Sequence, residues 1–445
     1  MSLRQTTSYE IPSRLSPRAP GPAGRRTLLA LAALTAACAG CDTRPGAVDP
    51  FGPIITVAAA GGTRPTVAVD PCDGTVYVAW IGGGEGGTDL FLSRIDPGAE
   101  APNPPVRVNH IPGDAAPHDQ APPRVVVGPE GNVYVAWQNN TEIPGRRFPA
   151  SNLRFARSTD RGTNFEPAIF VNDDAEAGPP ASHTFHDMAV AADGTIVVSW
   201  IDSRTRATQQ PGTKASADAQ HHGQEHHEIG PEIRVATSSD RGRSFGPSQI
   251  VDTNACPCCR TAIVLGEDGA AYIAWRKVFP GGIRDIVVAR VDVRAPTHVA
   301  HDPVRPHHDD WRFDACPHAG PALFVAEDSV VHVAWYTGQP GRAGLYLAAS
   351  NDGGATFGAA LPILTAEALP PSQVALAPIS DGALLVAWED RRHPERTIRT
   401  ALLRDGRLDE IATTLHGATP DLTHANGTTA LAWLDGDAVK VRIAR

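Results

Sequence analysis

The chain has 445 residues, a formal net charge of −10 and 20% charged residues, with 42 glycines and 40 prolines. This acidic balance, without a basic stripe of interleaved aromatic residues, argues against nucleic acid as a partner. The glycines and prolines predict many short elements joined by turns, and after the first 45 residues no long stretch keeps a 3.6-residue apolar period. The composition therefore predicts an all-β protein.

The first 41 residues are expected to be an export signal. Arg25 and Arg26 precede the apolar run TLLALAALTAA, which is too short to span a bilayer. The following LTAACAGC resembles a bacterial lipoprotein signal, which implies that Cys41, or alternatively Cys38, is lipidated. The paired arginines also resemble a twin-arginine signal. We therefore expect an exported protein of the cell envelope, in the periplasm or on the cell surface, anchored to the membrane by lipid through a tether of residues 42–50.

A unit built around a tryptophan repeats through residues 51–445, which we take as one domain. Each unit has an inner strand, a tight turn, a strand that ends in Trp, a loop and a third strand, and most units have a fourth. Four short antiparallel strands that recur in this way are typical of propeller blades, which bury their faces against one another. We predict a β-propeller of seven blades, with six as the alternative. The tryptophans of the repeat are Trp80, Trp137, Trp200, Trp275, Trp335, Trp388 and Trp433.

The last unit stops after its third strand, VKVRIA, at the end of the sequence. The run PIITVAA, residues 53–59, precedes the first unit and belongs to none of them. We predict that this run supplies the missing outer strand of the last blade. Such a pairing closes the ring and removes an exposed sheet edge.

Three units carry a second motif, S-x-D-x-G-x-x-F, in the turn between their third and fourth strands. In such a turn the Asp accepts backbone N–H bonds, the Gly permits a positive φ and the Phe packs between sheets. The pattern resembles the Asp-box, or BNR repeat, of the sialidase superfamily, which implies a propeller but no particular activity. The residues are Asp160, Gly162 and Phe165, then Asp240, Gly242 and Phe245, and then Asp352, Gly354 and Phe357.

One face of the expected ring holds nearly all the long insertions. In a four-stranded blade the loops after the second strand and the crossings between blades lie on this face, which makes it the expected functional face. Most of the 17 histidines fall in these segments, including His118, His183 and His186 and four in the tract AQHHGQEHHEIGPE. Because the innermost strands line the central channel, residues just before them are predicted at the channel mouth.

Four cysteines are predicted to meet at this mouth. Cys256, Cys258 and Cys259 precede the inner strand of the fourth unit, and Cys316 precedes that of the fifth. Cys72 lies alone, in a turn on the opposite face. In an oxidising exported location, one interpretation is a disulfide between Cys316 and the CPCC segment.

The other interpretation of these cysteines is a transition-metal site. Thiolates with imidazoles suit copper or zinc, and a soft, cysteine-rich set under exported conditions favours copper. The two interpretations are compatible if a disulfide forms on oxidation and the reduced cysteines bind metal. The candidate ligands are Cys256, Cys258, Cys259, Cys316, His318, His186 and His118.

The resemblance to sialidases also implies a set of catalytic residues. Enzymes of that superfamily hold a carboxylate with three arginines and use an Asp as acid and a Tyr, activated by a Glu, as nucleophile. No Glu obviously pairs with the tyrosine that fits this role, and the family spacing R-I-P is shortened here to R-P. The matching positions are Arg64, Arg124 and Arg260, with Asp119 or Asp187 as acid and Tyr336 as nucleophile.

Three functions follow from this pattern. The first is binding of a ligand or a transition metal, copper or zinc, at the Cys/His-rich channel mouth. The second is hydrolysis of the exo-sialidase type, and the third is non-catalytic recognition of a glycan or a protein partner by the loop-rich face. We expect a monomer in each case.

Overall fold

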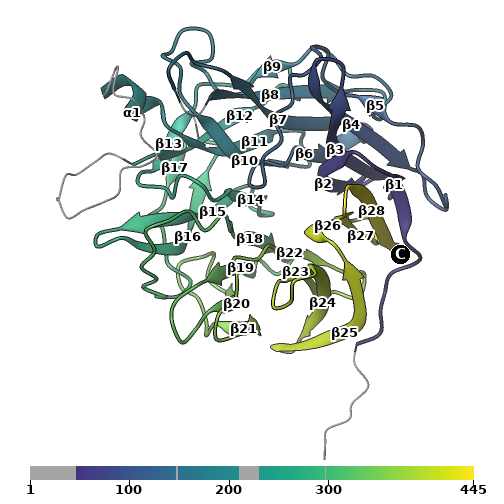
Figure 1. The fold of residues 1–445 in the computed structure, drawn as a ribbon, viewed down its shortest axis with the longest axis vertical. Helices are drawn as coiled ribbons and strands as arrows, with labels where there is room; N and C mark the ends of the chain where they lie inside the picture. Colours follow the sequence, from purple (N-terminus) through teal and green to yellow (C-terminus); the bar gives the residue numbers. More distant parts are fainter. Residues whose placement is uncertain (1–46, 147–148, 210–229, 296) are drawn as a thin grey trace, which may run out of the picture. The chain divides into compact units, whose positions relative to one another are not determined.

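The computed structural model describes residues 47–445 except 147–148, 210–229 and 296. In this part of the chain 28 strands form seven four-stranded antiparallel sheets, arranged in a ring (Figure 1). The prediction of seven blades is confirmed. The expected signal, the expected lipidation site Cys41 and the four histidines of the polar tract lie outside the described residues. Within them, no helix is long and apolar enough to cross a membrane.

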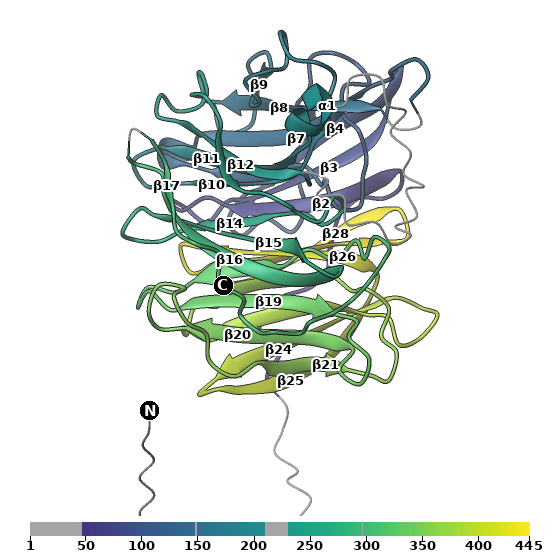
Figure 2. The same cartoon turned by 90° about the vertical axis from the view of Figure 1, so that its left-hand side faces the viewer.

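The blades follow one another in chain order, and each runs from its inner to its outer strand, except that blade 7 takes its outer strand, β1, from the N-terminal part of the described chain. Figure 2 shows sheets of successive blades along one side of the ring. Blades 1 to 3 contain β2 (Gly62–Val69), β3 (Val76–Gly84), β4 (Gly87–Ile95) and β5 (Val106–Arg107); β6 (Arg124–Val127), β7 (Val133–Thr141), β8 (Ala150–Ser158) and β9 (Ile169–Phe170); and β10 (His183–Val190), β11 (Ile196–Asp202), β12 (Glu232–Ser238) and β13 (Gln249–Asp252).

The remaining blades repeat this order. Two short helices, η1 (Pro129–Gly131) and α1 (Arg204–Gln209), lie in connecting segments. Blades 4 to 7 contain β14 (Ala262–Leu265), β15 (Ala271–Phe279), β16 (Ile283–Asp292) and β17 (Val299–Ala300); β18 (Ala322–Val325), β19 (Val331–Thr337), β20 (Gly344–Ser350) and β21 (Leu361–Thr365); β22 (Val374–Pro378), β23 (Leu384–Asp390), β24 (Thr397–Arg404) and β25 (Arg407–His416); and β26 (Ala418–Ala425), β27 (Thr428–Asp435), β28 (Ala438–Ala444) and β1 (Ile55–Ala58).

The hydrophobic core lies between neighbouring blades. Each of the seven repeat tryptophans sits in the second strand of its blade and is buried. One apolar cluster, for example, joins Tyr77 and Ile81 of blade 1 to Val135 and Trp137 of blade 2. A single blade could not bury both faces of its sheet, so the repeat is stable only as a ring.

The N-terminal strand closes the ring as predicted. Strand β1 pairs antiparallel with β28, with Ile55 opposite Val441. The residues just before β1 are also held: Asp49 accepts hydrogen bonds from the Oγ1 of Thr413 at 2.6 Å and from Nη1 of Arg442 at 2.9 Å. The end of the expected tether is therefore attached to β25 of blade 6 and to β28 of blade 7.

The three S-x-D-x-G-x-x-F turns share one hydrogen-bond pattern. In blade 3, Asp240 accepts bonds from the Oγ of Ser238 at 2.8 Å and from the backbone N–H of Ser244 at 3.0 Å. The N–H of Gly242, at φ 79°, donates to the same serine Oγ. Each turn packs against the preceding blade, and a Cβ at Gly242 would lie 2.7 Å from the ring of Phe155 in blade 2.

We expect Gly242→Ala to lower the free energy of unfolding by about 2–4 kcal/mol, since the alanine combines a left-handed backbone with a clash against Phe155. Gly382→Ala is the matched control, because Gly382 has φ 82° and a Cβ added there would meet no atom within 4 Å. The control should cost only about 1 kcal/mol. Chemical denaturation measures both values, and equal losses would show that the turn does not depend on its contact with blade 2.

The start of blade 3 corrects one expectation. The sequence predicts His183, His186 and Asp187 in the loop before the inner strand, but all three belong to β10. The pairing of β10 with β11 shifts register between Thr184 and Asp187, which accommodates polar side chains at the beginning of the strand.

Candidate metal centre

The CPCC segment lies between β13 of blade 3 and β14 of blade 4 and is fixed by backbone hydrogen bonds. The N–H of Cys256 donates to the carbonyl of Arg276 in β15 at 2.7 Å, and the N–H of Thr261 donates to the carbonyl of Phe185 in β10 at 3.0 Å. The segment is thus held by strands of two blades. These hydrogen bonds fix the positions of its cysteines relative to both blades.

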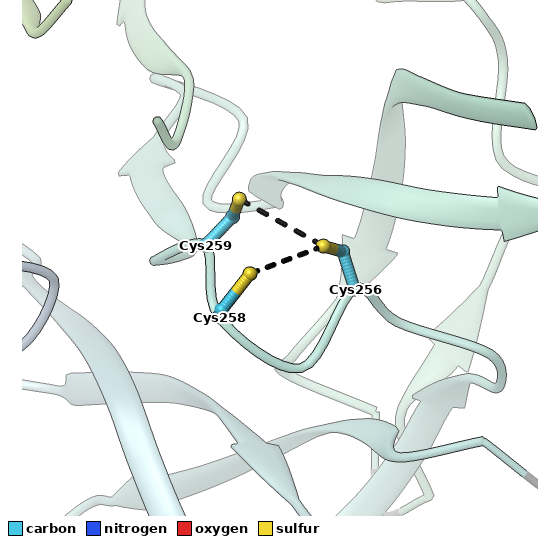
Figure 3. A group of neighbouring side chains, drawn as sticks. All are labelled: Cys256, Cys258 and Cys259. Atoms are coloured by element: carbon cyan, nitrogen blue, oxygen red, sulfur yellow. Dashed lines mark hydrogen bonds between the residues drawn. The ribbon is translucent and has the colours of Figure 1, made fainter. Parts of the chain in front are cut away.

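Three thiol groups face one another in this segment (Figure 3). The sulfur of Cys256 lies 3.6 Å from that of Cys258 and 3.8 Å from that of Cys259. All three side chains are buried, with at most 3% of their surface exposed. A tetrahedral ion with metal–sulfur bonds of about 2.3 Å separates its sulfur ligands by about 3.8 Å, so these thiols fit a metal site.

A second group joins the same segment to blade 5. Ligand atoms of Cys258, Cys316 and His318 lie within 4.8 Å of one another. Cys316 and His318 precede β18 and are exposed, whereas Cys258 is buried. The prediction that the crossings before blades 4 and 5 bring these cysteines together is confirmed.

The cysteines of the described residues carry free thiols: Cys72, Cys256, Cys258, Cys259 and Cys316. Among the described residues no disulfide joins any of them. Cys72 is exposed in the turn between β2 and β3, on the opposite face from the cluster, as expected.

Two arginines that the sequence reasoning missed border the thiols. Nη1 of Arg284 donates to the sulfur of Cys256 at 3.1 Å. Arg276 is fully buried and donates to three backbone carbonyls, and no ion pair with a carboxylate is found for either arginine among the described residues. The available signal for Arg276 was its position directly after Trp275, in a strand whose only other charged residue is Lys277.

These surroundings shift the pKa values of the thiols in different directions. Hydrogen bonds to Cys258 and Cys259, followed by the charges of Arg284 and Arg276, hold the pKa of the Cys256 thiol well below its usual range. Burial raises the pKa of Cys259 to about 12. The contact with Cys258 likewise lowers the pKa of Cys316. The pKa is therefore lowered at Cys256 and Cys316 and raised at Cys259.

His118 lies beside this cluster but is oriented by its own chain. Its ring centroid is 6.0 Å from that of His318. Its Nδ1 accepts the backbone N–H of Gln120 at 3.1 Å, which leaves the proton of the neutral ring on Nε2. The ring belongs to neither group of possible ligands among the described residues. The neighbouring Asp119 forms an ion pair with Arg64.

His186 lies apart from both groups. It is completely buried, and its Nε2 contacts the carbonyl oxygen of Ala136 at 3.2 Å. Burial lowers its pKa to about 4, so the ring is neutral at physiological pH. The structure does not bring this candidate ligand to the cysteines.

The central channel holds the other charged candidates. A cavity of about 300 Å³ is lined by inner strands and by Arg124, Asp187, Arg260 and Asp421. Arg124 forms ion pairs with Asp187 at 2.9 Å and Asp421 at 3.2 Å. The two carboxylates also accept backbone N–H groups of neighbouring inner strands, from Val67 and Ile263. These ion pairs and hydrogen bonds connect the inner strands of different blades.

Arg260 differs from the other two candidate arginines. Its side chain is nine-tenths buried, and among the described residues it forms no ion pair with a carboxylate. Burial, followed by the charge of Arg124, lowers its pKa to about 10. Because Arg64 and Arg124 are already paired with aspartates, the three guanidinium groups do not form one open clamp.

Tyr336 is part of the core rather than of the channel. Only 3% of its surface is exposed, and its hydroxyl donates to the carbonyl of Leu369 at 2.6 Å. Its ring packs edge-on against Trp311. Burial raises its pKa, which is unfavourable for a nucleophile.

The comparisons with known proteins concern the fold. No model of a known protein family matches the chain, and no curated protein matches it. An ulvan lyase of the polysaccharide lyases superposes with a TM-score of 0.56 at 11% identity, covering 87% of this chain and 94% of that chain. The Hadza microbial sialidase gives a TM-score of 0.49 at 15% identity, over 84% of this chain and 73% of that one. At its identity the ulvan lyase supports a similarity of fold alone.

Proposed function

We propose that this propeller binds a soft transition metal, Cu(I), at the cysteine cluster on its channel mouth. One observation carries the proposal: four sulfurs and one imidazole from the segments before two adjacent inner strands form two groups, each within 4.8 Å. Thiolate-rich sets select copper and zinc over harder ions such as magnesium and calcium. The spacing of the sulfurs supports the same conclusion.

Charge favours Cu(I) over zinc at the buried thiols. Three thiolates around a monovalent ion keep two negative charges, which the guanidinium groups of Arg276 and Arg284 balance. A divalent ion would leave one uncompensated positive charge in a buried site, and this is unfavourable. The two arginines thus suit the lower-charged ion.

The test is copper content after anaerobic loading of the reduced protein, followed by desalting and elemental analysis. We expect at least one copper per wild-type chain and none above background in the triple variant Cys256→Ser, Cys258→Ser, Cys259→Ser. Cys72→Ser is the control and should bind as the wild type does. Circular dichroism checks that the triple variant is folded. A wild type without copper, or a folded triple variant with unchanged copper, would contradict the proposal.

Sialidase-type hydrolysis is supported less well. It needs an open arginine clamp and a tyrosine nucleophile, whereas Arg64 and Arg124 are paired with aspartates and Tyr336 is in the core. Cleavage of a fluorogenic sialoside at a rate that Arg260→Ala abolishes would favour the hydrolase instead. If the protein neither binds copper nor cleaves the sialoside, recognition of a glycan or protein partner is the alternative that remains.

We also propose that the chain is exported and lipid-anchored through Cys41. The lipoprotein-like signal supports this location, and a propeller held at a membrane would present its metal site outside the cytoplasm. Incorporation of a labelled fatty acid that Cys41→Ser abolishes tests the anchor. Unchanged labelling in this variant would refute the choice of Cys41.

A further inference from the structure

We infer that the cluster holds two copper ions, bridged by the sulfur of Cys258. The inference rests on the proposed function and goes beyond it in the number of ions and in the role of each ligand. It starts from one observation, that two ligand groups share a single residue. We call Cys256, Cys258 and Cys259 the inner group, and Cys258, Cys316 and His318 the outer group.

One ion cannot contact all five ligands. Two ligands of the same ion, each at about 2.3 Å from it, lie no more than about 4.6 Å apart. The ligand atoms within each group lie within 4.8 Å of one another, but among the described residues no larger group combines the two. The five ligands therefore define two positions for an ion rather than one.

The inner group suits an ion enclosed by sulfur. The sulfur of Cys256 faces those of both Cys258 and Cys259, at 3.6 and 3.8 Å (Figure 3). Cys256 and Cys259 have no exposed surface. A buried set of three thiolates without a hard ligand fits Cu(I), which prefers soft donors.

The outer group has a different character. It consists of two sulfurs and one imidazole, and Cys316 and His318 are exposed to solvent. His318 is held at φ 51°, and its carbonyl accepts a hydrogen bond from Nε2 of Gln373 at 2.8 Å, which fixes the residue next to Cys316. This position is accessible to a copper donor or acceptor, and the inner position is not.

The shared sulfur explains how both positions can be filled. A thiolate has several lone pairs, so Cys258 can bind two monovalent ions at once. Four thiolates with two Cu(I) ions keep two negative charges, which Arg276 and Arg284 balance as they do for the inner ion alone. Two Zn(II) ions would cancel the four thiolates and leave both arginines uncompensated. Charge balance therefore favours two copper ions over two zinc ions.

An anaerobic titration of the reduced full chain with Cu(I), in competition with a chromogenic Cu(I) chelator, tests the inference. We expect two equivalents in the wild type and one in each half-site variant. Cys259→Ser removes a ligand of the inner group alone, and Cys316→Ser removes one of the outer group alone. Raising the chelator concentration should strip copper from Cys259→Ser before Cys316→Ser, because the remaining ion of Cys259→Ser is exposed.

The outcomes separate this inference from the proposed function. No copper in the folded wild type contradicts both. One equivalent in the wild type overturns the two-ion inference while the proposed function stands, whether Cys316→Ser keeps that ion or loses it. Two equivalents that both half-site variants retain would place the second ion elsewhere and likewise overturn the bridge. Cys72→Ser controls for binding by an unrelated thiol.

Discussion

Replacing Cys258 by serine should weaken copper binding more than any other single substitution in the cluster. Cys258 is the one residue that belongs to both the inner and the outer group. Loss of a residue that hydrogen-bonds to a metal ligand lowers metal affinity by about 10–100-fold. Loss of a sulfur that itself binds two ions should therefore lower the copper affinity by more than about 100-fold. The chelator competition described above measures this effect.

Comparison with Cys259→Ser distinguishes the loss of a bridging sulfur from the loss of any buried thiol. Both residues are buried thiols of the same segment, and a serine at either position changes one sulfur to oxygen. If Cys258 bridges two ions, its serine variant loses both at a chelator concentration that leaves one ion on Cys259→Ser. Identical copper content in the two variants would show that Cys258 has no special role.

Replacing Arg276 by methionine should lower the free energy of unfolding by about 3 kcal/mol or more. The guanidinium donates to the carbonyls of Arg284 at 2.8 Å, Ala319 at 3.1 Å and Tyr336 at 2.7 Å. It also lies over the ring of Trp311, 5.1 Å from the ring centroid. Methionine fills part of the space but leaves the buried carbonyls without donors, and each unsatisfied group costs about 1–3 kcal/mol.

Urea denaturation of the reduced, metal-free protein measures this loss. Arg290→Met is the control, because Arg290 lies on β16 and pairs with Asp268 near the surface, at 2.7 Å. Such surface pairs contribute no more than about 1 kcal/mol. If the two variants lose the same stability, the carbonyl contacts of Arg276 do not hold blades 4 and 5 together.

The fold could be predicted from the sequence because its signals are local and repeated. The strand ending in Trp, the turn before it and the S-x-D-x-G-x-x-F turn each recur at the same place in the blade. The closing strand followed from a missing partner in the last unit and an unused strand near residue 55. The prediction for the start of β10 was wrong because His183 and His186 are polar residues in a strand that is bent by a register shift.

The candidate site was predicted in part. The meeting of Cys258 with Cys316 followed from topology, because each precedes an inner strand of adjacent blades. The burial of His186 depends on the direction of one side chain in a bulged strand, which sequence does not reveal. Ion pairs such as that of Arg124 with Asp421 join residues far apart in the chain, so a free arginine could not be told from a paired one.

The most direct test of a thiolate-held soft metal is X-ray absorption at the copper edge of the anaerobically loaded wild-type protein. A sulfur-dominated first shell around Cu(I) is the predicted result, with a copper neighbour at short distance as the sign of the bridge through Cys258. A first shell of nitrogen and oxygen alone would contradict the account, because it would place the copper away from the four cysteines.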